Sequence, residues 1–93
     1  MPVLVHIPES MRDYCGCQEE LSVLPGSIAE ALGELQRTHP HVYRCVCDET
    51  GAVRKHIHLF VNNDFVPVRH RRGAEVRLES GDVLTIWTAV SGG

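Results

Sequence analysis

The last residues of the chain are the ones whose types and spacing best suit chemistry. The sequence ends in Ser91-Gly92-Gly93, separated by three residues from the largely apolar run at residues 83–87. Glycine has no Cβ, so two consecutive glycines are thin and adopt backbone conformations closed to other residues. Such a segment can enter a narrow enzyme cleft and present the α-carboxylate of Gly93 for activation. Mobile glycines also end many chains without any function, so the dipeptide alone decides nothing.

Four cysteines are the second group that could do chemistry. They form two pairs with one residue between the partners, Cys15 with Cys17 and Cys45 with Cys47. Four thiolates can hold zinc tetrahedrally, but structural zinc sites prefer two to four residues between paired ligands. Free thiols in a reducing cytosol are the favoured interpretation, with a disulfide or a four-cysteine zinc site as the alternatives. No metal site is therefore predicted.

The histidines do not form a recognisable catalytic pattern. His56 and His58 alternate with Ile57, which places them together on one face of a strand, and a solvated strand face explains them. No Ser-His-Asp or Cys-His spacing supports nucleophilic catalysis. No catalytic residue is predicted, and the chain is not expected to be an enzyme.

Length and composition limit the function further. The 93 residues are enough for one domain, with 43% apolar residues, 23% charged residues and a net charge of −3. The basic run at residues 69–72 is too short for a nucleic-acid surface, so no nucleic-acid partner is expected. Because no apolar stretch approaches the roughly 20 residues of a membrane span and no signal-peptide pattern is present, a cytoplasmic protein without a membrane partner is expected.

The first half of the sequence predicts a hairpin followed by a helix. Apolar residues alternate over residues 3–7 up to Pro8, and a second strand is plausible at residues 20–24. The intervening residues 9–17 are interpreted as a loop. Ser27 and Glu30 fit a capping box, and apolar residues then recur at helical spacing, which predicts a helix at about residues 28–38. Pro40 is expected to stop this helix.

The second half predicts further strands after a long, irregular connection at residues 40–55. Residues 56–61 alternate, Asn62-Asn63-Asp64 suits a turn, and residues 65–66 return antiparallel. In the last strand, Leu84 and Ile86 share one face, and Thr85 and Trp87 share the other. This order predicts an α+β fold, in which one main helix covers one face of a mixed sheet of four to five strands.

The order of elements and the tail together resemble the β-grasp (ubiquitin-like) fold and, more closely, the MoaD/ThiS family of sulfur-carrier proteins. The resemblance covers nearly the whole chain as a single domain, residues 1–93, with a flexible tail at about residues 89–93. Its marks are the turn at Val61-Asn62-Asn63-Asp64 and the run Gly81-Asp82-Val83-Leu84-Thr85-Ile86, which leads through Ala89-Val90-Ser91 to Gly92-Gly93.

The resemblance implies a carrier that acts through its C-terminal carboxylate. In that family an E1-like enzyme uses ATP to adenylate the terminal glycine, which is converted to a thiocarboxylate that delivers sulfur. Gly93 would bear the sulfur and Gly92 would give clearance. The partners implied are the activating enzyme, a sulfur donor enzyme and an acceptor biosynthetic enzyme. No cofactor is expected on the carrier, which is expected to be a monomer when free.

The branch of the family follows from softer features. The chain is longer than the thiamine-pathway carriers, mainly between the helix and the third strand, and its tail looks most like carriers for cysteine or related sulfur-metabolite synthesis. Two alternatives remain open at this stage. One is a ubiquitin-like modifier joined through Gly93 to lysines of other proteins, and the other is the small subunit of molybdopterin synthase.

The fold implied by the resemblance also predicts a partner surface. Strands one, three and five would be neighbours, so Leu4, Phe60 and Trp87 would form an apolar patch on the face without the helix, beside the tail residues Val90 and Ser91. Exposed apolar patches on small domains usually mark partner sites. The alternative is that a loop covers Trp87. Because the first and last strands would be parallel, both cysteine pairs are expected at the end of the sheet from which the tail leaves.

Overall fold

The computed structural model describes residues 1–67 and 75–88 of the chain. The predicted tail, with Val90, Ser91, Gly92 and Gly93, lies outside the described residues, as does the basic run at residues 69–72. In the described part of the chain, no helix is both long and apolar enough to cross a membrane.

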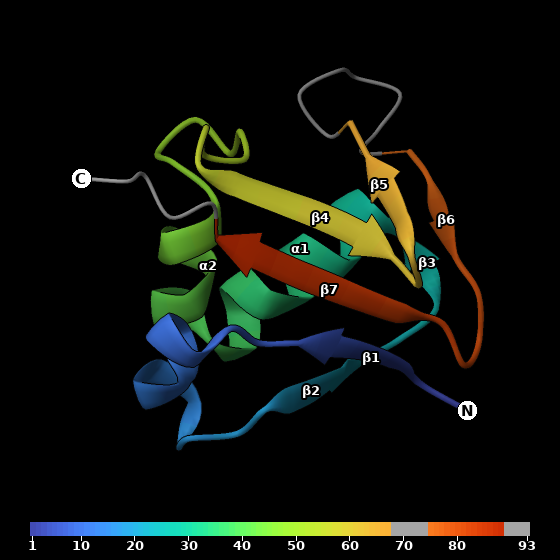
Figure 1. The fold of residues 1–93 in the computed structure, drawn as a ribbon, viewed down its shortest axis with the longest axis horizontal. Coiled ribbons are helices and arrows are strands. Elements are labelled where there is room, and N and C mark those ends of the chain that lie inside the picture. Colours follow the sequence, from blue (N-terminus) through green and yellow to red (C-terminus); the bar gives the residue numbers. More distant parts are fainter. Residues whose placement is uncertain (68–74, 89–93) are drawn as a thin grey trace.

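The main sheet contains five strands in the order β2-β1-β7-β4-β5. Their bounds are β1 Val3–His6, β2 Glu20–Val23, β4 Ile57–Val61, β5 Asp64–Val66 and β7 Val83–Thr88. The central pair, β1 and β7, is parallel, and the other neighbouring pairs are antiparallel. A short second sheet joins β3 (Gly26–Ser27) to β6 (Arg77–Leu78). This topology, drawn in Figure 1, is the predicted β-grasp arrangement.

Helix α1, Ile28–Thr38, has the predicted bounds because its capping box is formed. The Glu30 amide donates to the Ser27 hydroxyl oxygen at 3.1 Å, and the Ser27 amide donates to the Glu30 carboxylate at 2.9 Å. These reciprocal bonds satisfy amides that a helix start otherwise leaves without partners. The bond from the Ser27 amide also lowers the pKa of the Glu30 carboxyl.

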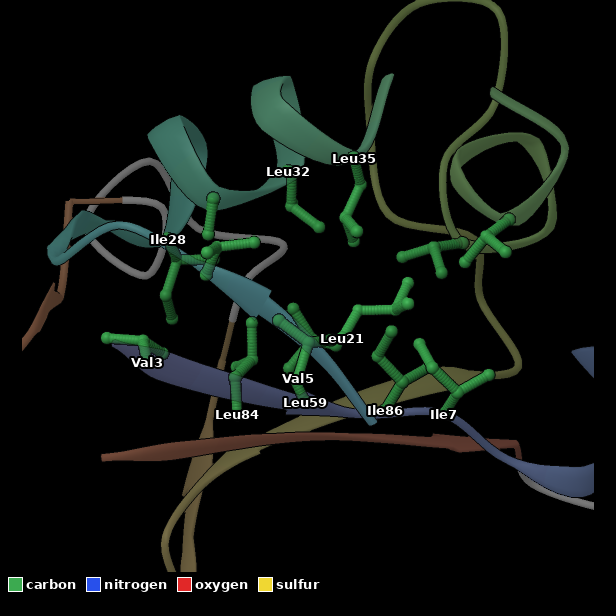
Figure 2. Packing of buried hydrophobic residues seen from close by; sticks show 14 of the residues in the cluster. Val3, Val5, Ile7, Leu21, Ile28, Leu32, Leu35, Leu59, Leu84 and Ile86 are labelled. Atoms are coloured by element: carbon green, nitrogen blue, oxygen red, sulfur yellow. The ribbon is translucent and has the colours of Figure 1, made fainter. Parts of the chain in front are cut away.

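The core lies between the main sheet and the helices; in Figure 1, α1 crosses behind the sheet, and η1 and α2 lie at the end toward which β1 and β7 run. Figure 2 shows Leu32 and Leu35 of α1 pointing toward the strands, opposite Leu84 and Ile86 of β7. The predicted inward-facing strand residues are buried, namely Val3, Val5, Ile7, Ile57, Leu59, Leu84 and Ile86. Val61, at the end of β4, is half-buried. The assignment of strand faces is therefore confirmed.

The interpretation of residues 9–17 as a loop is wrong, because Glu9–Cys15 forms the 3₁₀ helix η1. Its two buried residues, Met11 and Cys15, face the core. Gly16 and Cys17 then adopt positive φ angles of 68° and 62°, which turn the chain toward β2.

The interpretation of residues 40–55 as wholly irregular is also wrong, because Pro40–Val46 forms helix α2. Pro40 does end α1, since His39 before it has a φ of −138° and a ψ of 70°. The same proline then starts α2, where its fixed φ and missing N–H are tolerated in the first turn. Val42 and Val46, one helical turn apart, are fully buried and hold α2 on the core.

Candidate functional site

The face of the sheet opposite the helices carries the predicted partner residues. Trp87 of β7 is 53% exposed, so no described loop covers it. Phe60 and Leu4 are half-buried and alternate with core residues on β4 and β1. The structure therefore confirms the side of the sheet on which these three residues lie.

Four rings gather on this face and form what we term the aromatic cluster, namely His58, Phe60, Phe65 and Trp87. The His58 ring lies 6.0 Å from the Trp87 ring and 5.7 Å from the Phe65 ring, measured between centroids. Phe60 and Phe65 meet edge to face at 5.7 Å. Because Trp87 and Phe65 are both more than half exposed, the aromatic cluster is an apolar surface open to solvent.

Leu4 is offset from this cluster. In the strand register Leu4 pairs with Val83 of β7, whereas Phe60 pairs with Thr85 from the other side of β7. The rings of the predicted patch therefore lie on β4, β5 and the end of β7, whereas Leu4 lies on β1 beside the start of β7.

Phe65 is the member of the aromatic cluster that the sequence did not single out. It pairs with Phe60 in the β4–β5 hairpin, whose turn is tied to the start of β7 by Asn62. The Asn62 amide donates to the Val83 carbonyl at 2.7 Å, and the Val83 amide donates to the Asn62 side-chain oxygen at 3.1 Å. Asn62 has a φ of 57°, a conformation that asparagine tolerates better than most residues. This tight turn fixes the register that brings the two phenylalanines together.

Strand β7 also ends at a shallow surface depression, which we term the tail-root depression because residues 89–93 follow Thr88. Its polar lining comes from η1, α2 and the connection before β4, through Tyr14, Arg44, Arg54 and His56. Cys45 and Thr88 also line it. In Figure 1 the head of β7 lies beside α2 and near η1.

The four cysteines are free thiols with different exposure. Cys17 is exposed, Cys45 is half-buried, and Cys15 and Cys47 are buried. Burial raises the pKa of the Cys45 thiol, and it raises the pKa of Cys47 to about 11. These two thiols therefore stay neutral near pH 7 and are poor nucleophiles.

The two cysteine-bearing segments share one end of the molecule, since η1 packs on α2. Within residues 1–67 and 75–88, however, no three His, Cys, Asp or Glu side chains are placed to hold a metal ion. The zinc alternative therefore has no support in the geometry of the described chain.

Comparison with known proteins identifies the family. The ThiS family profile matches residues 5–93, which is nearly the whole chain. The chain belongs to the ThiS family. Among curated ThiS-like relatives, the sulfur carrier protein CysO of Mycobacterium tuberculosis is 26% identical over 95 residues, covering all of both sequences. The protein of the same name from Mycobacterium bovis matches equally well.

Several solved structures share the fold of this chain. A chain in the crystal structure of the Amycolatopsis orientalis BexX/CysO complex is 27% identical, with a TM-score of 0.82 over 98% of this chain and 99% of that chain. Mycobacterium tuberculosis CysO, at 24% identity, has a TM-score of 0.80 over 95% and 99% of the two chains. The small archaeal modifier protein 1 of Methanosarcina acetivorans, at 23% identity, shares the fold with a TM-score of 0.79 over 98% and 95%.

Proposed function

We propose that this ThiS-family chain is a sulfur carrier whose Gly93 carboxylate is adenylated and converted to a thiocarboxylate. The observation that carries the proposal is the family match, which runs through residue 93 and so includes the Gly92-Gly93 end. The likeness to CysO over the full length of both sequences supports a carrier for cysteine or a related sulfur metabolite. The chain itself supplies the acyl group and is not an enzyme in this account.

The proposed chemistry needs only the terminal carboxylate of the carrier. A Gly93 carboxylate oxygen attacks the α-phosphate of ATP, and pyrophosphate leaves. A sulfide sulfur then attacks the acyl carbon, so that a C–S bond forms, the C–O bond to AMP breaks, and AMP departs. ATP is bound and used by the E1-like activating enzyme, and the carrier holds no cofactor. Because ATP is required, we place the carrier and this enzyme in the cytoplasm.

The aromatic cluster is proposed as the surface that the activating enzyme recognises. Trp87 lies on β7, the strand that continues into the tail, so a contact at Trp87 helps to direct Gly93 into the enzyme cleft. Buried aromatic anchors supply much of the energy of protein interfaces. Leu4 would contact the edge of the same interface, and Val90 and Ser91 would line the cleft entrance with the glycines.

The acceptor enzyme is proposed to use the same tail after sulfur is loaded. In the A. orientalis BexX/CysO complex, a protein similar to this chain assembles with a second protein, which supports partner binding by this chain. A sulfur donor enzyme supplies the sulfide, and an acceptor biosynthetic enzyme receives the thiocarboxylate sulfur. Because one tail serves each reaction, these partners would bind in turn.

A modifier joined through Gly93 to lysines of other proteins is the second candidate. The shared fold of small archaeal modifier protein 1 is compatible with it, and adenylation is common to both functions. Peptides that carry Gly-Gly remnants on lysine would favour modification, whereas auxotrophy for a sulfur metabolite after gene deletion would favour the carrier. Co-purification with a large catalytic subunit would instead indicate the small subunit of molybdopterin synthase.

Adenylation can be tested by ATP–pyrophosphate exchange with the E1-like enzyme of the same organism. Exchange is expected with the full chain and not with a chain that lacks Gly93. Equal exchange with both chains would overturn the proposal, because the reactive carboxylate would then not belong to Gly93.

A further inference from the structure

The tail-root depression carries two guanidinium groups that the proposed carrier chemistry does not use. Arg44 comes from α2 and Arg54 from the connection that follows it. They lie beside Thr88, the last described residue of β7.

Arg54 is held in place by both its backbone and its side chain. Its amide donates to the Val46 carbonyl at 2.9 Å, and its Nε donates to the Arg44 carbonyl at 2.8 Å. Both carbonyl groups belong to the last turn of α2, where carbonyls can lack an amide partner within the helix. The side chain therefore loses little further freedom on binding a ligand, and the outer guanidinium N–H groups remain free of these two bonds.

Among the described residues, no acidic side chain lines this depression. Within the part of the chain that the structure describes, arginines form ion pairs at Arg37–Glu34 and Arg77–Glu30, and none involves Arg44 or Arg54. Asp48 and Glu49 line a neighbouring pocket that Arg44 and Arg54 also border, and the Asp48 Oδ1 accepts from the Thr50 amide at 2.8 Å and the Thr50 hydroxyl at 2.6 Å. On the side of the tail-root depression, the charged groups among the described lining residues are therefore the two guanidinium groups, on a chain whose net charge is −3.

We infer that the tail-root depression binds carboxylate side chains on the rim of the activating enzyme. This inference rests on the proposed function. Residues 89–93, extended in a cleft, span at most about 17 Å. When Gly93 reaches ATP, the depression therefore lies far from the nucleotide phosphates and faces the protein surface around the cleft. Guanidinium groups bind carboxylates through paired, charge-assisted hydrogen bonds.

The expected effect is on the rate of association more than on the chemistry of activation. Charges at the rim of an interface mainly steer encounter, and salt screens this steering. Aromatic contacts at Trp87 would supply affinity, while Arg44 and Arg54 would orient the root of the tail toward the cleft.

The test compares Arg44→Glu with Arg37→Glu, a matched control on α1 that makes the same change in charge. Stopped-flow association with the activating enzyme at low salt should slow about tenfold for Arg44→Glu, and the difference should shrink at high salt. Arg37→Glu should remain near the parent rate. Equal association rates and equal salt dependence for the two variants would overturn the inference, even if Gly93 is still adenylated.

A second measurement tests the depression without the enzyme. A glutamate-rich hexapeptide should shift the NMR amide signals of Cys45, Arg54 and His56 in the parent protein but not in Arg44→Glu. The absence of these shifts would count against a carboxylate site. Stronger binding of inorganic phosphate than of the peptide at the same residues would also overturn it, because the site would then suit a phosphate ligand.

Discussion

At the scale of single residues, Leu32 tests the packing of α1 on the sheet. Leu32 is 7% exposed and points toward the strands (Figure 2). Leu32→Ala should lower the free energy of unfolding by about 2–5 kcal/mol through lost burial and a cavity. Urea unfolding measures this change, and a near-neutral result would contradict the helix register.

Gly33, the next residue, provides the matched comparison on the same helix. It is exposed, and a Cβ built on it meets no atom within 4 Å. Gly33→Ala should therefore raise the free energy of unfolding by about 0.5–1 kcal/mol, because alanine loses less backbone entropy in a helix. A destabilised variant would show that the described helix surface is not open at this position.

Cys47 predicts a pH dependence of stability. Burial raises the pKa of its thiol from 9.0 to about 11, so the folded state keeps the proton longer than the unfolded state. The contribution of the neutral Cys47 thiol to the free energy of unfolding is therefore complete below about pH 9 and is lost as the pH rises toward 11.

Between pH 8 and pH 11, the urea midpoint of the parent should therefore fall more than that of Cys47→Ala, which lacks the thiol. Parallel pH profiles for the two proteins would show that Cys47 titrates alike in both states.

At the scale of elements, β7 joins the aromatic cluster to the tail. Trp87→Glu should weaken binding to the activating enzyme by about 2 kcal/mol or more, as the loss of an aromatic anchor does. Stability should change little, because Trp87 is 53% exposed. Titration calorimetry and thermal melting measure the two effects separately.

Gln36→Glu is the control for this change, since Gln36 is exposed on α1, which packs on the opposite face of the sheet. It should bind like the parent. If Trp87→Glu melted at a much lower temperature while binding was unchanged, Trp87 would be a packing residue and not a partner contact.

The sequence predicted elements whose signals are local. Ser27 and Glu30 define the start of α1, Pro40 lies directly after its end, and strict alternation assigns the faces of β1, β4 and β7. Helix α2 was missed because Pro40 was interpreted only as a stop, although proline also starts helices. Its remaining signal was the spacing of Val42 and Val46, too short to be distinctive in seven residues.

The candidate site could likewise be predicted only where its residues follow from local patterns in the sequence. Trp87 and Phe60 follow from alternation, but Phe65 depends on the hairpin register that Asn62 fixes. The tail-root depression could not be predicted, because Arg44 and Arg54 come from a segment without an expected structure and meet only through the end of α2.

At the scale of the whole molecule, the fold separates stability from recognition. One face of the sheet is covered by helix α1 (Figure 1) and holds the core, while the other presents the aromatic cluster. Strand β7 lies between β1 and β4, so both its neighbours hold it in place. In the proposed function, this arrangement leaves the terminal carboxylate to be presented to each partner enzyme in turn.

The central claim is most directly tested by the mass of the chain after incubation with the activating enzyme, ATP and a sulfur donor. The parent should pass through an AMP adduct and then gain the mass difference between sulfur and oxygen. A chain without Gly93 should form neither product and should melt like the parent. If the shortened chain still acquired sulfur and passed it to the acceptor at the parental rate, the reactive group would lie elsewhere and the account would be contradicted.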